Sequence, residues 1–206
     1  MSERATQARL AVAAFASWVV GALFARRFGL WVGIGPVSVA LGVAALVLDG
    51  GALRALLRPS AARVVRGLAV GAAMTALTYA LYPLFVRVVP AGALETRRLY
   101  VVFSSLPPAA AALLLLPVIA GEELVWRGVV QGALARRVGP VAGVLVGAAV
   151  YAAAHAAAGS LLLVVVALGC GVVWGTLRAV GDDLVAPLIA HVVWDVSLLL
   201  VHPLVR

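Results

Sequence analysis

The sequence predicts an all-α fold, a polytopic bundle of transmembrane helices with about seven spans. Hydrophobic residues make up 65% of the chain and charged residues 12%, and the mean hydropathy is +1.13. Soluble globular domains have a lower apolar share, roughly 45–50%, so a water-soluble fold is not expected. A membrane helix needs about 20 apolar residues. The 206 residues therefore have room for six to eight spans in one integral membrane domain, residues 1–206.

The first half of the chain is predicted to contain three spans. The apolar stretches run over about residues 10–24, 30–48 and 68–86. Arg26 and Arg27 separate the first two stretches, which predicts a tight helical hairpin. Residues 52–66 interleave arginines with Leu and Val, a pattern typical of a short amphipathic helix that lies along the membrane surface. The segment 99–106 shows no decisive pattern.

The second half is predicted to contain four more spans. Proline has no amide hydrogen and suits the first turn of a helix, so we expect a long helix to begin near Pro107 and to run through Glu122 towards Arg136. The breaks between the later spans contain glycine, as expected for turns, and are Gly139-Pro140, Gly159-Ser160 and Gly181-Asp182-Asp183. These spans cover about residues 141–158, 161–176 and 184–201. The part of the chain that carries the polar motifs described below is thus about 107–201.

The charge distribution predicts an orientation in the membrane. All 16 basic residues are arginines, and the net charge is +8. They lie singly or in pairs between apolar stretches, which membrane topology explains better than nucleic-acid binding does. If the N-terminus is cytoplasmic, the opposite side receives only Arg26, Arg27, Arg87, Arg97, Arg98 and Arg206. The positive-inside rule favours this orientation. Because the arginines are scattered, we expect no nucleic-acid partner. The lack of lysine is typical of a GC-rich genome, so we expect the protein in a bacterial inner membrane.

Five ionisable residues lie inside predicted spans. An ionisable side chain at the centre of the bilayer costs about 2.5–3.5 kcal/mol on insertion scales. Such residues are therefore expected to pair with one another, to line a wet cavity or to have a function. They are Glu122, Glu123, His155, His191 and Asp195.

The spacing of these residues indicates which of them can interact. Glu123 and Arg127 are four residues apart on one helix face and can form an ion pair, whereas Glu122 points about a hundred degrees away. His191 and Asp195 are also four apart. Structural alternatives remain for each group: glutamates that reach the interface, a core histidine at position 155, or a His–Asp pair that joins two helices.

Together, the three groups are the components of a centre that activates water. A glutamate can act as general base towards a water that a histidine also holds, and neighbouring groups can stabilise the oxyanion formed when the water attacks an amide. The same residue types could instead hold a catalytic zinc ion. The spacing does not separate these two chemistries.

The order of the motifs resembles the CPBP family, also called the Abi family, of CAAX prenyl proteases and bacteriocin-processing enzymes. The motifs read Glu122-Glu123-x-x-x-Arg127, Tyr151-x-x-x-His155 and His191-x-x-x-Asp195. Each lies in its own predicted helix. The resemblance covers Glu122 to Asp195, and the other helices contribute only hydropathy to it.

The resemblance implies an intramembrane endopeptidase of the glutamate type. In it Glu122 activates water together with His155, and Arg127 holds Glu123. His191 and Asp195 face the scissile carbonyl. No obligatory metal or other cofactor is implied. Zinc, held by Glu122, His155 and His191, is the alternative.

Two positions depart from the usual family pattern. Tyr151 stands where phenylalanine is usual, which adds a hydroxyl that needs a partner. Asp195 stands where asparagine also occurs, and an ionised aspartate cannot donate a hydrogen bond to an oxyanion. Asp195 is therefore either protonated or serves to orient His191.

The expected partners are the lipid bilayer and a membrane-anchored protein or peptide. Relatives of this kind process CAAX tails or bacteriocin leaders, serve as immunity proteins, or remove sorting anchors as the myxosortases do. A non-catalytic scaffold or immunity protein is the first competing hypothesis, and a small transporter with a proton relay is the second. No internal repeat supports the transporter.

Overall fold

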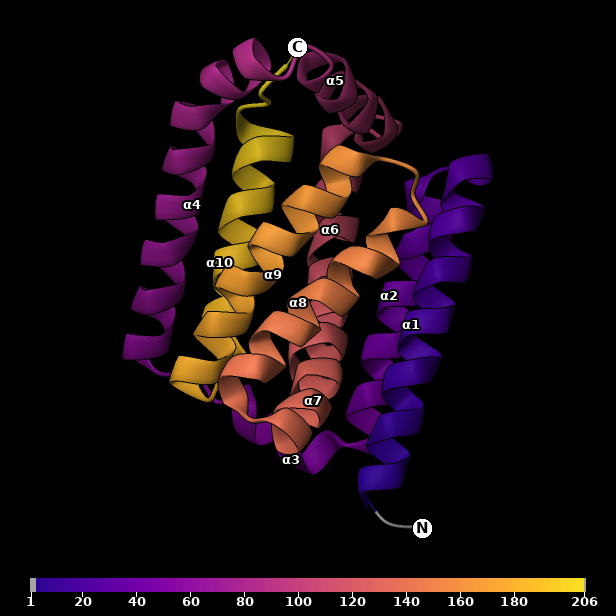
Figure 1. Cartoon of the computed structure of the whole chain (residues 1–206), viewed down its shortest axis with the longest axis vertical. Coiled ribbons are helices and arrows are strands. Elements are labelled where there is room, and N and C mark those ends of the chain that lie inside the picture. Colours follow the sequence, from indigo (N-terminus) through magenta and orange to yellow (C-terminus); the bar gives the residue numbers. More distant parts are fainter. Residues whose placement is uncertain (1–2, 206) are drawn as a thin grey trace.

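The computed structural model describes residues 3–205, with side chains from residue 7 onward, and all regular secondary structure in this range is helical (Figure 1). The elements in chain order are α1 (Glu3–Phe28), α2 (Leu30–Leu48), α3 (Gly50–Leu56), α4 (Ala61–Val88), α5 (Gly92–Phe103), α6 (Pro108–Glu122), η1 (Glu123–Val130), α7 (Gln131–Val138), α8 (Pro140–Ala156), α9 (Leu161–Gly181), α10 (Val185–Val196) and η2 (Ser197–Val201), where η marks a π-helix.

The long helices run up and down beside one another and leave two distinct ends (Figure 1). At the end called here the α3 end, α3 lies near the start of α1 and the α7–α8 and α9–α10 turns. At the opposite end, called the α5 end, α5 lies above the bundle, near the start of α6 and the last described residues. Every long helix therefore joins the two ends.

All seven predicted apolar stretches are helical in the structure. Within the described residues, five helices are long and apolar enough to cross a membrane: Gln7–Phe28, Leu30–Leu48, Ala61–Val88, Pro108–Val138 and Leu161–Gly181. Pro140–Ala156 and Val185–Val201 are shorter apolar helices. The chain is thus a polytopic helical membrane protein, and the predicted long helix from Pro107 is α6 continued by η1 and α7.

The predicted amphipathic helix over residues 52–66 is shorter than expected. The surface helix α3 ends at Leu56, and the chain breaks before α4 begins at Ala61. Pro59 disfavours helical geometry in the residue before it. The Ser60 side chain then accepts a hydrogen bond from the backbone N–H of Arg63, which caps a new helix. Residues 61–66 therefore belong to the long helix α4.

The segment 99–106 is also partly helical, because α5 continues to Phe103. The next helix begins at Pro108, as expected from the two prolines. Gly139 ends α7 with a φ of 87°, a left-handed conformation that favours glycine. The predicted Gly139-Pro140 break is therefore present.

The helix that carries the two glutamates lies at the centre of the bundle. α2 packs against α6 so closely that a Cβ atom on Gly121 would overlap the backbone of Ser38. The Ser38 hydroxyl donates to the carbonyl of Val118 at 2.7 Å. α8 packs along α9, and α10 packs along α4. Large apolar side chains cover the outside, including Leu113 at 75% and Leu161 at 76% exposure, as expected for surfaces that face lipid.

Candidate active site

A change of helix type occurs at the two glutamates. Glu122 is the last residue of α6 and Glu123 is the first residue of η1. In this π-helical segment the hydrogen bonds reach five residues back, as from Gln131 N–H to the carbonyl of Trp126. Single π-helical turns inside α-helices are frequent at functional sites. Both carboxylates are buried.

Tyr151 joins Glu122 to His155. The Tyr151 hydroxyl donates to Glu122 Oε2 at 2.6 Å, which is the partner that the additional hydroxyl needed. The backbone carbonyl of Tyr151 lies 2.8 Å from His155 Nδ1. Because a carbonyl can only accept, Nδ1 carries the hydrogen, and in the neutral ring Nε2 keeps its lone pair. One tyrosine thus positions both a carboxylate and an imidazole acceptor.

Glu123 lies in a different environment from its neighbour. Its Oε1 atom is 2.8 Å from His191 Nδ1 and 3.3 Å from Arg127 Nη1. The side chains of Glu123 and Arg127 are each only 2% exposed. The expected Glu123–Arg127 ion pair is therefore present, and it also holds His191.

The second nitrogen of His191 faces another carboxylate. His191 Nε2 lies 3.4 Å from Asp195 Oδ2. A ring that faces a carboxylate on both sides can donate to both only when both nitrogens carry hydrogen. Asp195 is more exposed than His191, with 14% of its side-chain area accessible. These two residues, four apart in the sequence, thus lie side by side and both line the cavity.

Aromatic rings fix the orientation of these polar groups. Trp174 of α9 stacks on the ring of His191, with centroids 3.7 Å apart and an angle of 19° between the planes. The Arg127 guanidinium carbon lies 4.4 Å from the centroid of the Tyr151 ring and 5.0 Å from that of Trp174. Such contacts stabilise a guanidinium in a desolvated environment.

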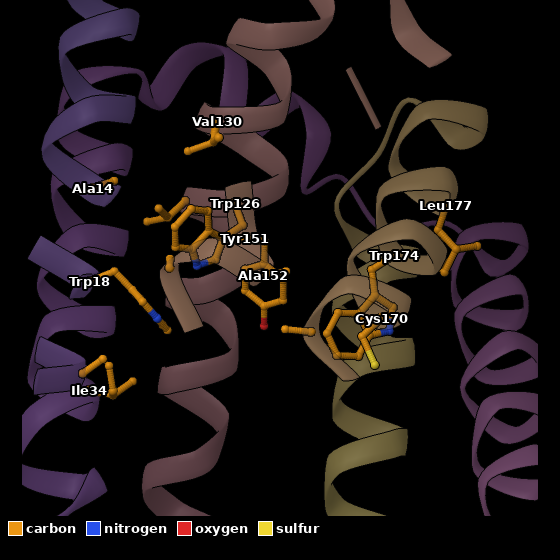
Figure 2. Close-up of a cluster of buried hydrophobic side chains, with 14 of the residues drawn as sticks. Ala14, Trp18, Ile34, Trp126, Val130, Tyr151, Ala152, Cys170, Trp174 and Leu177 are labelled. Atoms are coloured by element: carbon orange, nitrogen blue, oxygen red, sulfur yellow. The ribbon is translucent and has the colours of Figure 1, made fainter. Parts of the chain in front are cut away.

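A second aromatic group lies on the α1 side of the site. Trp18 contacts Trp126 at 5.5 Å and His155 also at 5.5 Å between ring centroids. Figure 2 shows Trp18, Trp126 and Tyr151 in a row, with Trp174 and Cys170 on the other side of the view. α1 is therefore part of the wall behind His155.

A cavity of about 500 Å³ connects these groups. Its polar lining in the middle of the bundle consists of Glu122, Tyr151, His155, His191 and Asp195. Glu123 and Arg127 do not line it. The remaining lining is largely apolar, from helices α1, α2, α4, α5, α9 and α10. A cavity with a few convergent polar groups in apolar walls is the usual form of a ligand site.

The side chains around the cavity do not fit a catalytic zinc ion. The alternative ligand set was Glu122, His155 and His191, in which only Nε2 of His191 could ligate a metal because Nδ1 contacts Glu123 at 2.8 Å. Catalytic zinc sites usually have three protein ligands. In the part of the chain that the structure describes, no group of three His, Cys, Asp or Glu side chains could hold a metal ion.

Trp174, Trp18 and Gln131 are site residues that the sequence motifs did not indicate. The Gln131 amide donates to the carbonyl of Gly175 at 2.8 Å and joins α7 to α9. Each of the three lies in or beside an apolar stretch. Nothing in the local pattern distinguishes them from core residues.

Residues 103–197 match the family model described as type II CAAX prenyl endopeptidase Rce1-like. This part of the chain is similar to the Rce1-like CAAX proteases. The matched region contains all three motifs and runs from the end of α5 to the start of η2. No curated protein and no solved structure matches the chain. Residues 103–197, called here the Rce1-like region, are thus the part of the chain that is similar to a protease family.

The matched region supplies Glu122, Tyr151, His155, His191 and Asp195 in the middle of the cavity, whereas helices outside it contribute much of the remaining lining. Trp18, Leu30 and Tyr82 line the cavity and precede residue 103. The family assignment therefore covers the chemistry of the site, and the shape of the cavity depends on the whole described chain.

Proposed function

We propose that this protein is an intramembrane endopeptidase that hydrolyses a peptide bond of a membrane-anchored protein or peptide with a water activated by Glu122. The observation that carries the proposal is the position of Tyr151. Its hydroxyl holds Glu122 and its carbonyl holds His155, and all three residues line one cavity. The Rce1-like family assignment supports the reaction class.

In the proposed first step, one water is held by two acceptors. Glu122 Oε2 accepts from Tyr151, which leaves Oε1 to accept a hydrogen from the water. His155 Nε2 accepts the other hydrogen. As the water oxygen attacks the scissile carbonyl carbon, Glu122 takes a proton, and the carbonyl oxygen becomes an oxyanion.

In the proposed second step, the carbon–nitrogen bond breaks. The oxyanion re-forms the carbonyl, and protonated Glu122 gives its proton to the departing nitrogen. The products are a carboxylic acid and an amine, and Glu122 is again ionised. The water supplies the new oxygen, so no other reactant is needed.

The proposed donor to the oxyanion is His191 Nε2–H. The distance of 3.4 Å to Asp195 exceeds the usual hydrogen-bond range of about 2.7–3.2 Å, so this N–H is available to a substrate oxygen. Glu123 holds the other nitrogen, and Trp174 fixes the plane of the ring. Asp195 is proposed to orient His191 rather than to donate, because an ionised carboxylate only accepts.

The experiment is a cleavage assay with purified protein in proteoliposomes and a membrane-anchored peptide library. We expect Glu122→Ala and His155→Ala to abolish cleavage while their thermal unfolding stays close to that of the wild type. The matched control is His202→Ala, because His202 does not line the cavity and this variant should cleave normally. Full cleavage by either site variant contradicts the proposal. A wild-type protein that cleaves nothing favours a non-catalytic scaffold instead.

The proposal uses no metal, because the donor set around the cavity does not fit a zinc ion. Elemental analysis of active purified protein tests this. Cleavage at the full rate by protein without stoichiometric zinc or another divalent ion is the expected result. Activity that rises and falls with the bound metal contradicts it.

A further inference from the structure

The catalytic cavity extends towards only one end of the bundle. Beyond the residues in the middle of the bundle, its lining continues to residues near the α5 end, such as Arg26, Trp31, Phe85, Tyr100, Phe103 and Ser160. α5 crosses above this region (Figure 1). The substrate and the water therefore reach Glu122 from the α5 end.

The opposite end is closed by packed side chains. Below the two glutamates, Trp126, Val130 and Leu184 are buried. Gln131 closes the space between α7 and α9 through its bond to Gly175. None of these residues lines the cavity. The site is therefore separated from the α3 end by a solid layer.

Ion pairs join the helix ends on this closed side. Arg66 lies 2.6 Å from Asp183, and Arg178 lies 2.7 Å from Asp182. Gln7 donates to Asp49 at 2.8 Å and also accepts from Arg136. These contacts connect α1, α4, α7 and α9 to neighbouring loops. The helix ends at the α3 end are thus held together by ion pairs and hydrogen bonds.

The arginines are distributed unequally between the two ends. Among the described residues, the α5 end has five arginines and the α3 end has nine. Those at the α5 end are Arg26, Arg27, Arg87, Arg97 and Arg98, and those at the α3 end are Arg4, Arg9, Arg54, Arg58, Arg63, Arg66, Arg136, Arg137 and Arg178. The positive-inside rule counts Lys and Arg, not net charge, so the acidic residues at the α3 end do not weaken it. The rule places the α3 end in the cytoplasm.

We propose that the cavity opens on the non-cytoplasmic side of the membrane. Its substrates are then membrane-anchored proteins whose scissile bond lies at or beyond the outer surface of the bilayer. The segment that enters is apolar, since apolar side chains form most of the lining. The choice of substrate rests on the proposed protease function. The side to which the cavity opens does not.

Cysteine labelling tests the orientation without any activity measurement. Cys170 is the single cysteine, so a Cys170→Ala background carries no thiol. Ala62 and Ala93 form a matched pair, because each is exposed and is the second residue of its helix, α4 at the α3 end and α5 at the α5 end. Each is replaced by cysteine and treated with a membrane-impermeant maleimide in intact spheroplasts and after permeabilisation.

We expect Ala93→Cys to be labelled in intact spheroplasts, and Ala62→Cys only after permeabilisation. Labelling of Ala62→Cys in intact spheroplasts overturns the proposal. So does an Ala93→Cys variant that reacts only after permeabilisation. Labelling of permeabilised samples reports that both variants are present in the membrane.

A pair of single-span reporters tests the substrate side. Both carry the same cleavable segment, taken from the peptide that the purified protein cleaves, one on the outer and one on the cytoplasmic side. We expect cleavage of the outer reporter only. Cleavage of the cytoplasmic reporter alone overturns the inference but leaves the protease function intact. If the purified protein cleaves no peptide at all, this result contradicts the protease function. The labelling result is unaffected in that case.

Discussion

Two adjacent glutamates have different surroundings in this protein. Glu122 lines the cavity and accepts from a tyrosine hydroxyl. Glu123 does not line the cavity, and it contacts Arg127 and His191. The first carboxylate can reach a water in the cavity and the second cannot. The two residues are therefore suited to different roles, one chemical and one positional.

Removal of either partner of the Glu123–Arg127 pair should destabilise the fold. Glu123→Ala or Arg127→Ala leaves a buried charge unpaired, which costs about 3–5 kcal/mol. We expect less folded protein in the membrane and a lower unfolding temperature in detergent. Normal yield and normal thermal unfolding of both variants would show that the pair does not hold the helices.

Tyr151→Phe removes one oxygen and keeps the aromatic ring. Hydrogen bonds to charged groups contribute about 1.5–3 kcal/mol, so we expect kcat to fall about tenfold or more, with KM and the unfolding temperature unchanged. The measurement is steady-state kinetics on a cleaved peptide. An unchanged kcat would show that the hydroxyl does not position Glu122.

Trp174 is expected to position His191 through stacking. Trp174→Phe keeps a flat ring against the imidazole and should retain most of the cleavage rate, whereas Trp174→Leu should lower kcat more than it changes KM. Both variants are compared by kinetics and thermal unfolding. Equal kcat for the two variants would contradict a role of the aromatic face.

At the scale of helices, the contact between α2 and α6 determines where Glu122 lies. Gly121 precedes Glu122, and a Cβ atom there would overlap Ser38 of α2. Small residues at helix contacts allow such close approach in membranes. The position of the catalytic helix therefore depends on α2, which lies outside the Rce1-like match.

Gly121→Ala should therefore force α2 and α6 apart, lowering both the unfolding temperature and the cleavage rate. The matched control is Gly169→Ala in α9, where an added Cβ atom meets no atom within 4 Å and where we expect no change. If the two variants behave alike, the close contact is not required.

The sequence predicted the helices better than the contacts between them. Apolar stretches and the breaks at Pro107 and Gly139 identified the long helices, because these signals are local. The boundary at Pro59 was missed, because interleaved Arg and Leu residues resemble a surface helix even where they begin a long membrane helix. The extent of α5 was left open, because residues 99–106 show no decisive pattern.

The candidate site was predictable only in part for a related reason. Polar residues in apolar helices are conspicuous, so Glu122, His155 and His191 were identified from sequence. A tryptophan such as Trp174 in an apolar helix is not conspicuous, although it stacks on His191. The cavity arises from non-local packing of many helices, which no local pattern contains.

At the scale of the whole molecule, the two ends have different structures. The α3 end is closed and joined by ion pairs, and the α5 end contains the cavity mouth. α5 is held there by hydrogen bonds, such as that from the Tyr100 hydroxyl to the carbonyl of Leu198 at 2.6 Å. In the proposed protease function, an apolar segment enters at the α5 end while the helices that carry the site residues stay in place.

The central claim is that Glu122, and not its neighbour, activates water. Glu122→Gln keeps the shape of the side chain and removes the base, so the most direct measurement is its peptide cleavage rate in proteoliposomes together with its thermal unfolding. We predict no detectable cleavage, with an unfolding temperature close to that of the wild type. Cleavage by Glu122→Gln at the wild-type rate would contradict the claim.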